Sequence, residues 1–113
     1  MITSNELLRG TLRTIVLKLL YEYGRMYGYE ITQKVKDLSG GEIQLTFGAL
    51  YPTLHKLEKE GILSTTSEVV DHRSRKYYEL TKTGEATAST KIEEYFAFIG
   101  NMNKIMSAQS NAI

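Results

Sequence analysis

A helix that ends in glycine and runs directly into two short strands leaves this chain few folds to adopt. The segment is 46–80, and Gly61 closes its helix because glycine readily takes the left-handed conformation of a C-terminal cap. Residues 62–70 and 77–80 are rich in Thr, Val and Tyr, which favour strands. The polar run 71–74 predicts the turn between them. We therefore predict a helix followed by a β-hairpin with a basic tip.

The helix in this segment has two distinct faces. Its apolar stripe consists of Leu50, Leu54 and Leu57, with Phe47 beside it. The opposite side carries small, polar and basic residues: Gly48, Ala49, Pro52, His55, Lys56 and Lys59. Because Pro52 lacks an N–H and clashes with the carbonyl four residues back, either the helix starts near Gly48 or its first turn is kinked.

Two further helices are predicted ahead of this segment. Thr3 and Glu6 have the spacing of a capping box at the start of the first, and Gly24 ends it. Its apolar residues recur at spacings of three and four: Leu8, Leu12, Ile15, Leu19 and Tyr23. The second helix begins near Gly28 and is broken by Ser-Gly-Gly at 39–41. Residues 42–45 fit either a small strand or an extended link.

The last predicted helix begins at Thr81, which is a good N-cap residue. Its apolar stripe contains Ile92, Tyr95, Phe96, Ile99, Met102, Ile105 and Met106. A helix this long cannot bury so wide a stripe against one small domain, and exposed apolar stripes usually mark interfaces. We therefore predict that it pairs with a second copy of the chain, the alternative being a helix folded back on its own core. The polar tail after Ser107 is expected to fray.

These elements give a fold that is mainly α with a small β-hairpin. Residues 1–80 form a winged helix-turn-helix domain, and residues 81–113 form a C-terminal dimerisation helix with its tail, within one compact unit. The length of 113 residues suits a single domain. A winged helix most often binds duplex DNA, although some members of this fold class serve only as protein-interaction modules.

Composition limits the location and partners of the chain. Its net charge is only +1, so a nucleic-acid function depends on where the charges lie. Cysteine is absent, which excludes disulfides and thiolate metal sites and fits a reducing cytoplasm. Glu6 and Arg9 interrupt the first apolar residues, so no signal peptide is indicated. The apolar run 15–20 is broken by Lys18 and is too short to span a membrane. We expect a cytoplasmic protein.

No pattern of residues indicates catalysis or a bound cofactor. The two histidines, His55 and His72, fall on a helix and at the hairpin tip, without a third ligand at metal spacing. No serine or acid is placed beside a base as an activated nucleophile requires. Gly40 and Gly41 lack the lysine and spacing of a phosphate-binding loop. We expect neither an enzyme nor a metal or cofactor protein.

Five segments, in order along the chain, carry a family resemblance. They are Leu-Arg-Gly-Thr-Leu at 8–12, Tyr-Gly-Tyr-Glu-Ile at 27–31, Gly-Ala-Leu-Tyr-Pro at 48–52, Leu-Glu-Lys-Glu-Gly-Ile-Leu at 57–63 and Arg-Ser-Arg-Lys-Tyr-Tyr-Glu-Leu-Thr at 73–81. Together they resemble the PadR family of bacterial transcriptional regulators, in its short form with one C-terminal helix. The chain departs from the usual pattern at Tyr27, where His is common, at Ala49, where Ser or Thr is common, and at His72, where Gly is frequent.

The resemblance implies a homodimeric winged-helix repressor. The last helix would pair with the partner subunit, often against its first helix. The implied dimer interface consists of Leu8 and Leu12 together with Ile92, Tyr95, Phe96, Ile99, Met102, Ile105 and Met106. Some family members bind flat aromatic compounds between their subunits, which makes Tyr95, Phe96 and Ile99 candidates for the wall of an effector cavity. The alternative, which we favour, is that these aromatic side chains simply pack the interface.

The expected DNA contacts come from the third helix and the hairpin tip. In a helix-turn-helix protein the second helix of the motif enters the major groove. The predicted DNA-binding residues are Gly48, Ala49, Tyr51, Pro52, His55, Lys56 and Lys59 on that helix, and Arg73, Arg75 and Lys76 on the hairpin. Tyr51 would donate its hydroxyl to a phosphate. The alternative for the helix is an ordinary solvated face, since Glu58 and Glu60 alternate with the two lysines. The alternative for the hairpin tip is an ordinary polar turn.

Overall fold

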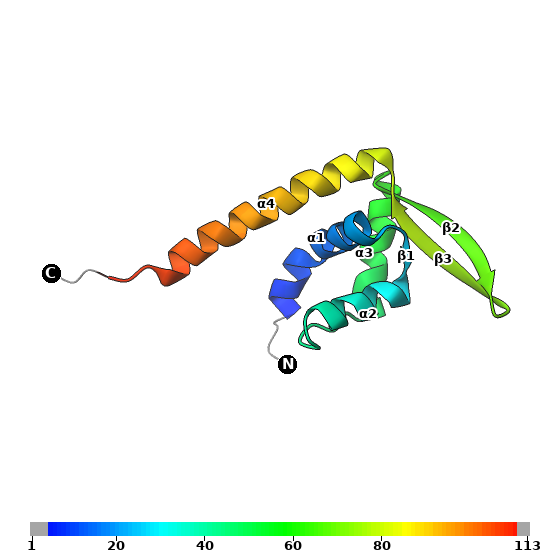
Figure 1. Cartoon of the computed structure of the whole chain (residues 1–113), viewed down its shortest axis with the longest axis horizontal. Coiled ribbons are helices and arrows are strands. Elements are labelled where there is room, and N and C mark those ends of the chain that lie inside the picture. Colours follow the sequence, from blue (N-terminus) through cyan, green and yellow to red (C-terminus); the bar gives the residue numbers. More distant parts are fainter. Residues whose placement is uncertain (1–4, 111–113) are drawn as a thin grey trace.

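The computed structural model describes residues 5–110, which form four helices and a small sheet (Figure 1). In chain order the elements are α1 Asn5–Tyr23, β1 Met26–Tyr27, α2 Gly28–Leu38, α3 Phe47–Lys59, β2 Leu63–Val70, β3 Arg73–Leu80 and α4 Lys82–Ser107. The mainly helical fold with a β-hairpin is confirmed. The predicted capping residue Thr3 lies outside the described residues.

The core lies between the first three helices and one face of the sheet. Leu50, Leu54 and Leu57 of α3 are fully buried, as their spacing predicts, and they pack with Leu17 of α1. Tyr78 of β3 completes this core and is only 1% exposed. Burial of these large side chains is the main force that holds α3 and the hairpin against α1.

Both ends of α3 follow from local sequence. The Thr46 hydroxyl accepts a hydrogen bond from the Ala49 N–H at 3.2 Å, so the helix begins at Phe47. It continues through Pro52, which lies in its second turn. Gly61 has a φ of +77°, and its N–H donates to the carbonyl of Glu58 at 3.0 Å. The next N–H donates to the carbonyl of Leu57, which completes a Schellman motif.

The sheet has three antiparallel strands in the order β1-β3-β2. The hairpin was predicted, but β1 was missed, because two residues are too few to show an alternating pattern. The predicted polar turn 71–74 is wrong in extent: only Asp71 and His72 form it, and Arg73 already pairs with Val70. Both turn residues have positive φ, 51° and 64°, as a type I′ hairpin turn requires. Residues 42–45 form a link without regular secondary structure rather than a strand.

The final helix, α4, extends well beyond the other elements. The Thr81 hydroxyl accepts from the Gly84 N–H at 2.9 Å, which confirms Thr81 as the N-cap. The first half of α4 packs along α1, whereas its second half projects past the other elements (Figure 1). The molecule is consequently 70 Å long but only 32 × 20 Å across. Within residues 5–110, no helix combines the length and apolarity needed to cross a bilayer.

Candidate nucleic-acid interface

The side of α3 opposite its leucine stripe is open to solvent. The exposed residues there are Gly48, Ala49, Pro52, His55, Lys56 and Lys59. Neither lysine makes an ion pair in the described part of the chain. Ala49 and Pro52 also border a groove of about 480 Å³ whose other wall includes Arg9 of α1. The side of α3 predicted to be exposed is therefore exposed, and its small residues lie beside Arg9, which was not among the predicted DNA-binding residues.

Tyr51 occupies a different position from the other predicted residues of α3. It is half-buried, and its ring lies between those of Phe47 and His55, with centroids 5.7 and 6.1 Å away. A methyl group on Gly28 would overlap the Tyr51 hydroxyl. The hydroxyl therefore lies against the start of α2, and Gly28 is needed for α2 and α3 to approach this closely.

The hairpin 63–80, here called the wing, separates its basic residues onto two faces. The strand register puts Arg75 opposite Glu68 and Tyr77 opposite Thr66, so these side chains share the outer face, away from the core. Lys76 points to the inner face, where its ammonium lies 3.5 Å from a carboxylate oxygen of Glu58 on α3. The wing cations that the sequence groups together therefore have different surroundings.

Two arginines stack on tyrosines across the outer face. The Arg25 guanidinium lies 4.2 Å from the centroid of the Tyr77 ring, and Arg75 lies 4.2 Å from that of Tyr27. The two rings meet edge to face with centroids 5.4 Å apart. A hydrogen bond with Tyr77 is the main cause that raises the pKa of Arg75 above its usual value. These contacts join the segment before α2 to the wing.

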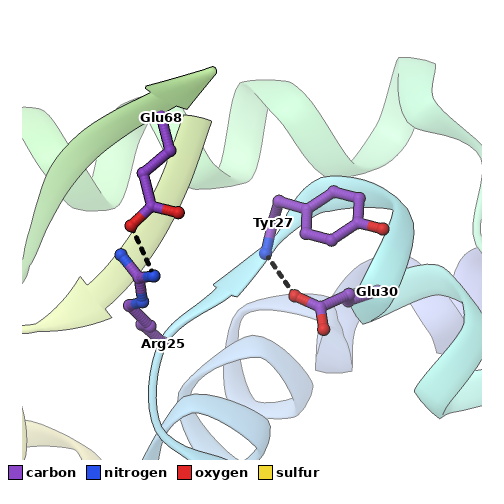
Figure 2. Close-up of polar contacts among 4 residues, drawn as sticks. All are labelled: Arg25, Tyr27, Glu30 and Glu68. Atoms are coloured by element: carbon purple, nitrogen blue, oxygen red, sulfur yellow. Dashed lines mark hydrogen bonds and ion pairs between the residues drawn. The ribbon is translucent and has the colours of Figure 1, made fainter. Parts of the chain in front are cut away.

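Arg25 also forms an ion pair within the same array. Its guanidinium donates to Glu68 Oε1 at 2.7 Å, so its side chain reaches β2 across β3 (Figure 2). The same bond is the main cause that raises the pKa of Arg25. Figure 2 also shows Glu30, which accepts from the Tyr27 N–H at 3.1 Å and so closes the start of α2.

Most glutamates on α3, at its C-terminal cap and on the wing are neutralised by basic partners. Glu58 pairs with Lys76, Glu60 pairs with Arg13 of α1 at 2.7 Å, and Glu68 pairs with Arg25. The cations left without an ion pair among the described residues are Lys56, Lys59, Arg73 and Arg75, against the acids Asp71 and Glu79. This surface is therefore locally positive although the whole chain carries only +1.

The predicted dimer residues fall into three environments. Leu12 belongs to the core of its own chain at 5% exposure, so it offers almost no surface to a partner. Leu8, Ile92, Tyr95, Ile99 and Met102 are partly buried, and Phe96, Ile105 and Met106 are exposed. An apolar groove of about 280 Å³ between α1, α2 and α4 includes Tyr95 and Phe96 in its lining but not Ile99.

Sequence reasoning missed several residues of these surfaces. Arg25 and Tyr27 lie outside the helix and hairpin that drew attention, and only the short pairing of β1 with β3 brings them to the wing. Leu38 and Phe98 are 61% and 55% exposed and add to the apolar surface near the groove and on α4. The available signal was weak: an arginine and a tyrosine on either side of a buried methionine fit a strand that exposes one face.

Comparison with known proteins gives consistent matches along most of the chain. A model of the transcriptional regulator PadR-like family matches residues 16–90. The chain is 34% identical over 92 residues to "Uncharacterized protein X" of Lysinibacillus sphaericus, covering 80% of this chain and 84% of that protein. It is 41% identical over 61 residues to transcriptional regulator Rv3488 of Mycobacterium tuberculosis, covering 54% of each.

Solved structures match the whole arrangement of helices and wing. A transcriptional regulator from Clostridium thermocellum aligns with a TM-score of 0.79 at 30% identity, covering 91% of this chain and 97% of that one. A PadR family regulator from Eggerthella lenta aligns with a TM-score of 0.77 at 28% identity, covering 92% and 88%. The similarity therefore extends beyond the winged domain into α4.

Proposed function

The chain belongs to the family of PadR-like transcriptional regulators, and from this premise we propose that it is a cytoplasmic repressor that binds operator DNA as a homodimer. The observation that carries the proposal is the charge distribution of α3 and the wing. Their glutamates other than Glu79 are held by basic partners, whereas Lys56, Lys59 and Arg73 remain free of ion pairs within residues 5–110. Cations without ion pairs on an exposed helix and hairpin can neutralise the phosphates of duplex DNA.

In the proposed complex α3 enters the major groove and the wing lies over the adjacent backbone. Gly48 and Pro52 permit close approach, and His55 is the exposed side chain of α3 best suited to reach a base edge. Lys56 and Lys59 contact phosphates, which suit an ammonium better than base edges do. Arg73 lies next to the hairpin turn and would follow the minor groove, where positive side chains are attracted. Most of these contacts position the protein, so we expect modest sequence specificity.

Titration of DNA from the gene's own upstream region tests the proposal. We expect binding whose affinity falls steeply between low and moderate salt, because each phosphate contact releases counterions. An unrelated duplex of equal length should bind more weakly at the higher salt. The rival function for this fold is a protein-interaction module without DNA binding. Equal, weak and salt-insensitive binding of both duplexes would favour that rival.

Two complementary apolar surfaces support the homodimer. The projecting half of α4 exposes Ile105 and Met106 at 58% and 76%. The groove between α1, α2 and α4 offers an apolar lining with Phe96 at 64% exposure. Because one chain carries both surfaces, two copies related by a two-fold axis can each insert the projecting helix against the other. A second copy is therefore the occupant that we propose for the groove.

Substitution of Ile105 with glutamate is expected to break the dimer. A charge placed in a desolvated interface should raise the dimer dissociation constant by at least about tenfold. Ile105 is exposed in the single chain, so the fold of each subunit should survive. Sedimentation over a range of protein concentrations measures the effect, and Ser107→Glu, an exposed polar position two residues on, is the matched control. A wild-type protein that remains a single copy at high concentration would contradict the homodimer.

The alternative occupant of this groove is an aromatic effector, which would make repression ligand-responsive. Its lining is almost entirely apolar and includes Tyr95 and Phe96. The two occupants can be distinguished at Tyr95, because only an effector site would bind a planar compound against its ring. Titration of a fluorescent planar compound into the wild type and Tyr95→Ala separates them: saturable binding that the variant loses supports an effector site, and equal negligible binding removes it.

A further inference from the structure

We propose that Arg25, which precedes β1, is a positioning residue for DNA binding: its ion pair with Glu68 fixes the angle of the wing relative to α3. The inference rests on the proposed DNA-binding function and assigns a role to a residue outside both α3 and the wing. Arg25 need not touch DNA to have this effect. It acts through Glu68 on β2 and through Tyr77 on β3.

The wing needs support because little of it is held by the rest of the sheet. β1 pairs with β3 only at Tyr77 and Tyr78. Beyond that point residues 67–76 of the hairpin have backbone pairing only with each other. A two-stranded hairpin is marginal by itself and twists readily. Side-chain contacts must therefore set the direction in which the wing tip and Arg73 point.

The two faces of the wing each have one such ion pair. On the outer face the Arg25 guanidinium donates to Glu68 Oε1 at 2.7 Å and lies over the Tyr77 ring, 4.2 Å from its centroid. On the inner face Lys76 lies 3.5 Å from Glu58 of α3. The outer pair is the shorter one, and its arginine is anchored directly before β1. It is the better candidate for holding the wing at one angle.

Removing the negative charge of Glu68 should change the affinity for DNA in opposite directions under the positioning role and under simple electrostatics. In the strand register Glu68 lies directly opposite Arg75, so both side chains belong to the outer face. If charge alone mattered, removing this negative group beside the DNA-binding cations would strengthen binding to phosphates. If the ion pair of Glu68 with Arg25 holds the wing in place, removing the Glu68 charge weakens DNA binding although the surface becomes more positive. The two accounts therefore predict opposite directions for one isosteric change.

The decisive experiment measures operator binding by Glu68→Gln at several salt concentrations. We expect affinity to fall by about three- to fivefold, the size of effect that a well-formed surface ion pair supports. The salt dependence should become shallower by about one unit of slope, because one phosphate contact at the wing tip is lost. The matched control is Glu22→Gln, which breaks the 2.7 Å pair with Lys18 on α1 and removes the same charge. It should leave the salt slope unchanged.

Arg25→Lys provides a second, independent variant. It keeps the positive charge but loses the planar stacking on Tyr77, so it should weaken binding in the same direction as Glu68→Gln. Thermal melting of each variant separates wing placement from loss of fold, since a stably folded variant with a shallower salt slope supports positioning. Tighter or unchanged binding by Glu68→Gln, with the wild type binding normally, would overturn the inference alone. A wild type that fails to bind DNA would overturn the proposed function instead.

Discussion

Replacing Gly84 with alanine is expected to lower the free energy of unfolding by at least about 2 kcal/mol, because overpacking at a rigid contact is strongly destabilising. A methyl group on Gly84 would overlap the carbonyl oxygen of Ile62 and lie 3.0 Å from its carbonyl carbon. This oxygen also accepts from the N–H of Thr81 at 3.0 Å. It cannot move away without losing that bond, so α4 itself must shift.

Circular dichroism melting measures this effect. For a chain of this size the melting temperature should fall by at least about 8 °C. Gly100 in the same helix is the control, because no atom lies within 4 Å of a methyl group built there. Gly100→Ala should leave stability unchanged or raise it by up to about 1 kcal/mol through better helix propensity. Equal melting temperatures for Gly84→Ala and the wild type would show that α4 does not pack against Ile62 as described.

The combined substitution of Arg73 and Arg75 with alanine is expected to weaken operator binding by roughly tenfold or more at moderate salt. The loss should be similar for all DNA sequences if, as we propose, these side chains contact the DNA backbone rather than base edges. The slope of log affinity against log salt should become shallower by about 2, or one for each lost phosphate contact. Fluorescence anisotropy with a labelled operator duplex, repeated at several salt concentrations, measures both quantities.

A pair of lysines on α4 provides the control for total charge. Lys82→Ala with Lys91→Ala removes the same positive charge from exposed positions that lie outside α3 and the wing. This variant should keep most of its affinity if the placement of charge decides binding. An equal loss in both double variants would mean that long-range attraction by the whole chain, rather than docking of the wing, governs the interaction.

Local sequence signals were sufficient for most of the fold. Glycine predicted the ends of α1, α2 and α3, and Thr81 predicted the start of α4, because capping depends on one or two residues. The extent of the hairpin turn was not predictable in the same way. Asp71 and His72 both adopt positive φ, and the usual signal for such a turn is an Asn-Gly or Asp-Gly pair. Histidine tolerates positive φ better than most residues, but a histidine in a sequence does not by itself predict that conformation.

The candidate site was harder to derive than the fold. Helical spacing identified the exposed side of α3, since Leu50, Leu54 and Leu57 had to be buried. Spacing could not show that Lys76 faces Glu58 while Arg75 faces Tyr27, because this depends on which face of the hairpin meets the core. Contacts between distant segments, such as the pair of Arg25 with Glu68, have no signature in a single sequence.

Glu58 links the two parts of the proposed DNA reader. One of its carboxylate oxygens accepts from the Thr65 hydroxyl at 3.1 Å, and the other lies 3.5 Å from Lys76, so one α3 side chain holds both wing strands. Together with the Arg25–Glu68 pair on the outer face, this contact should make α3 and the wing tilt as one rigid unit. In the proposed homodimer, a signal that releases DNA would then act by changing the distance between the two rigid units, and we expect mutations that desensitise such a response to lie in α4 rather than near the DNA.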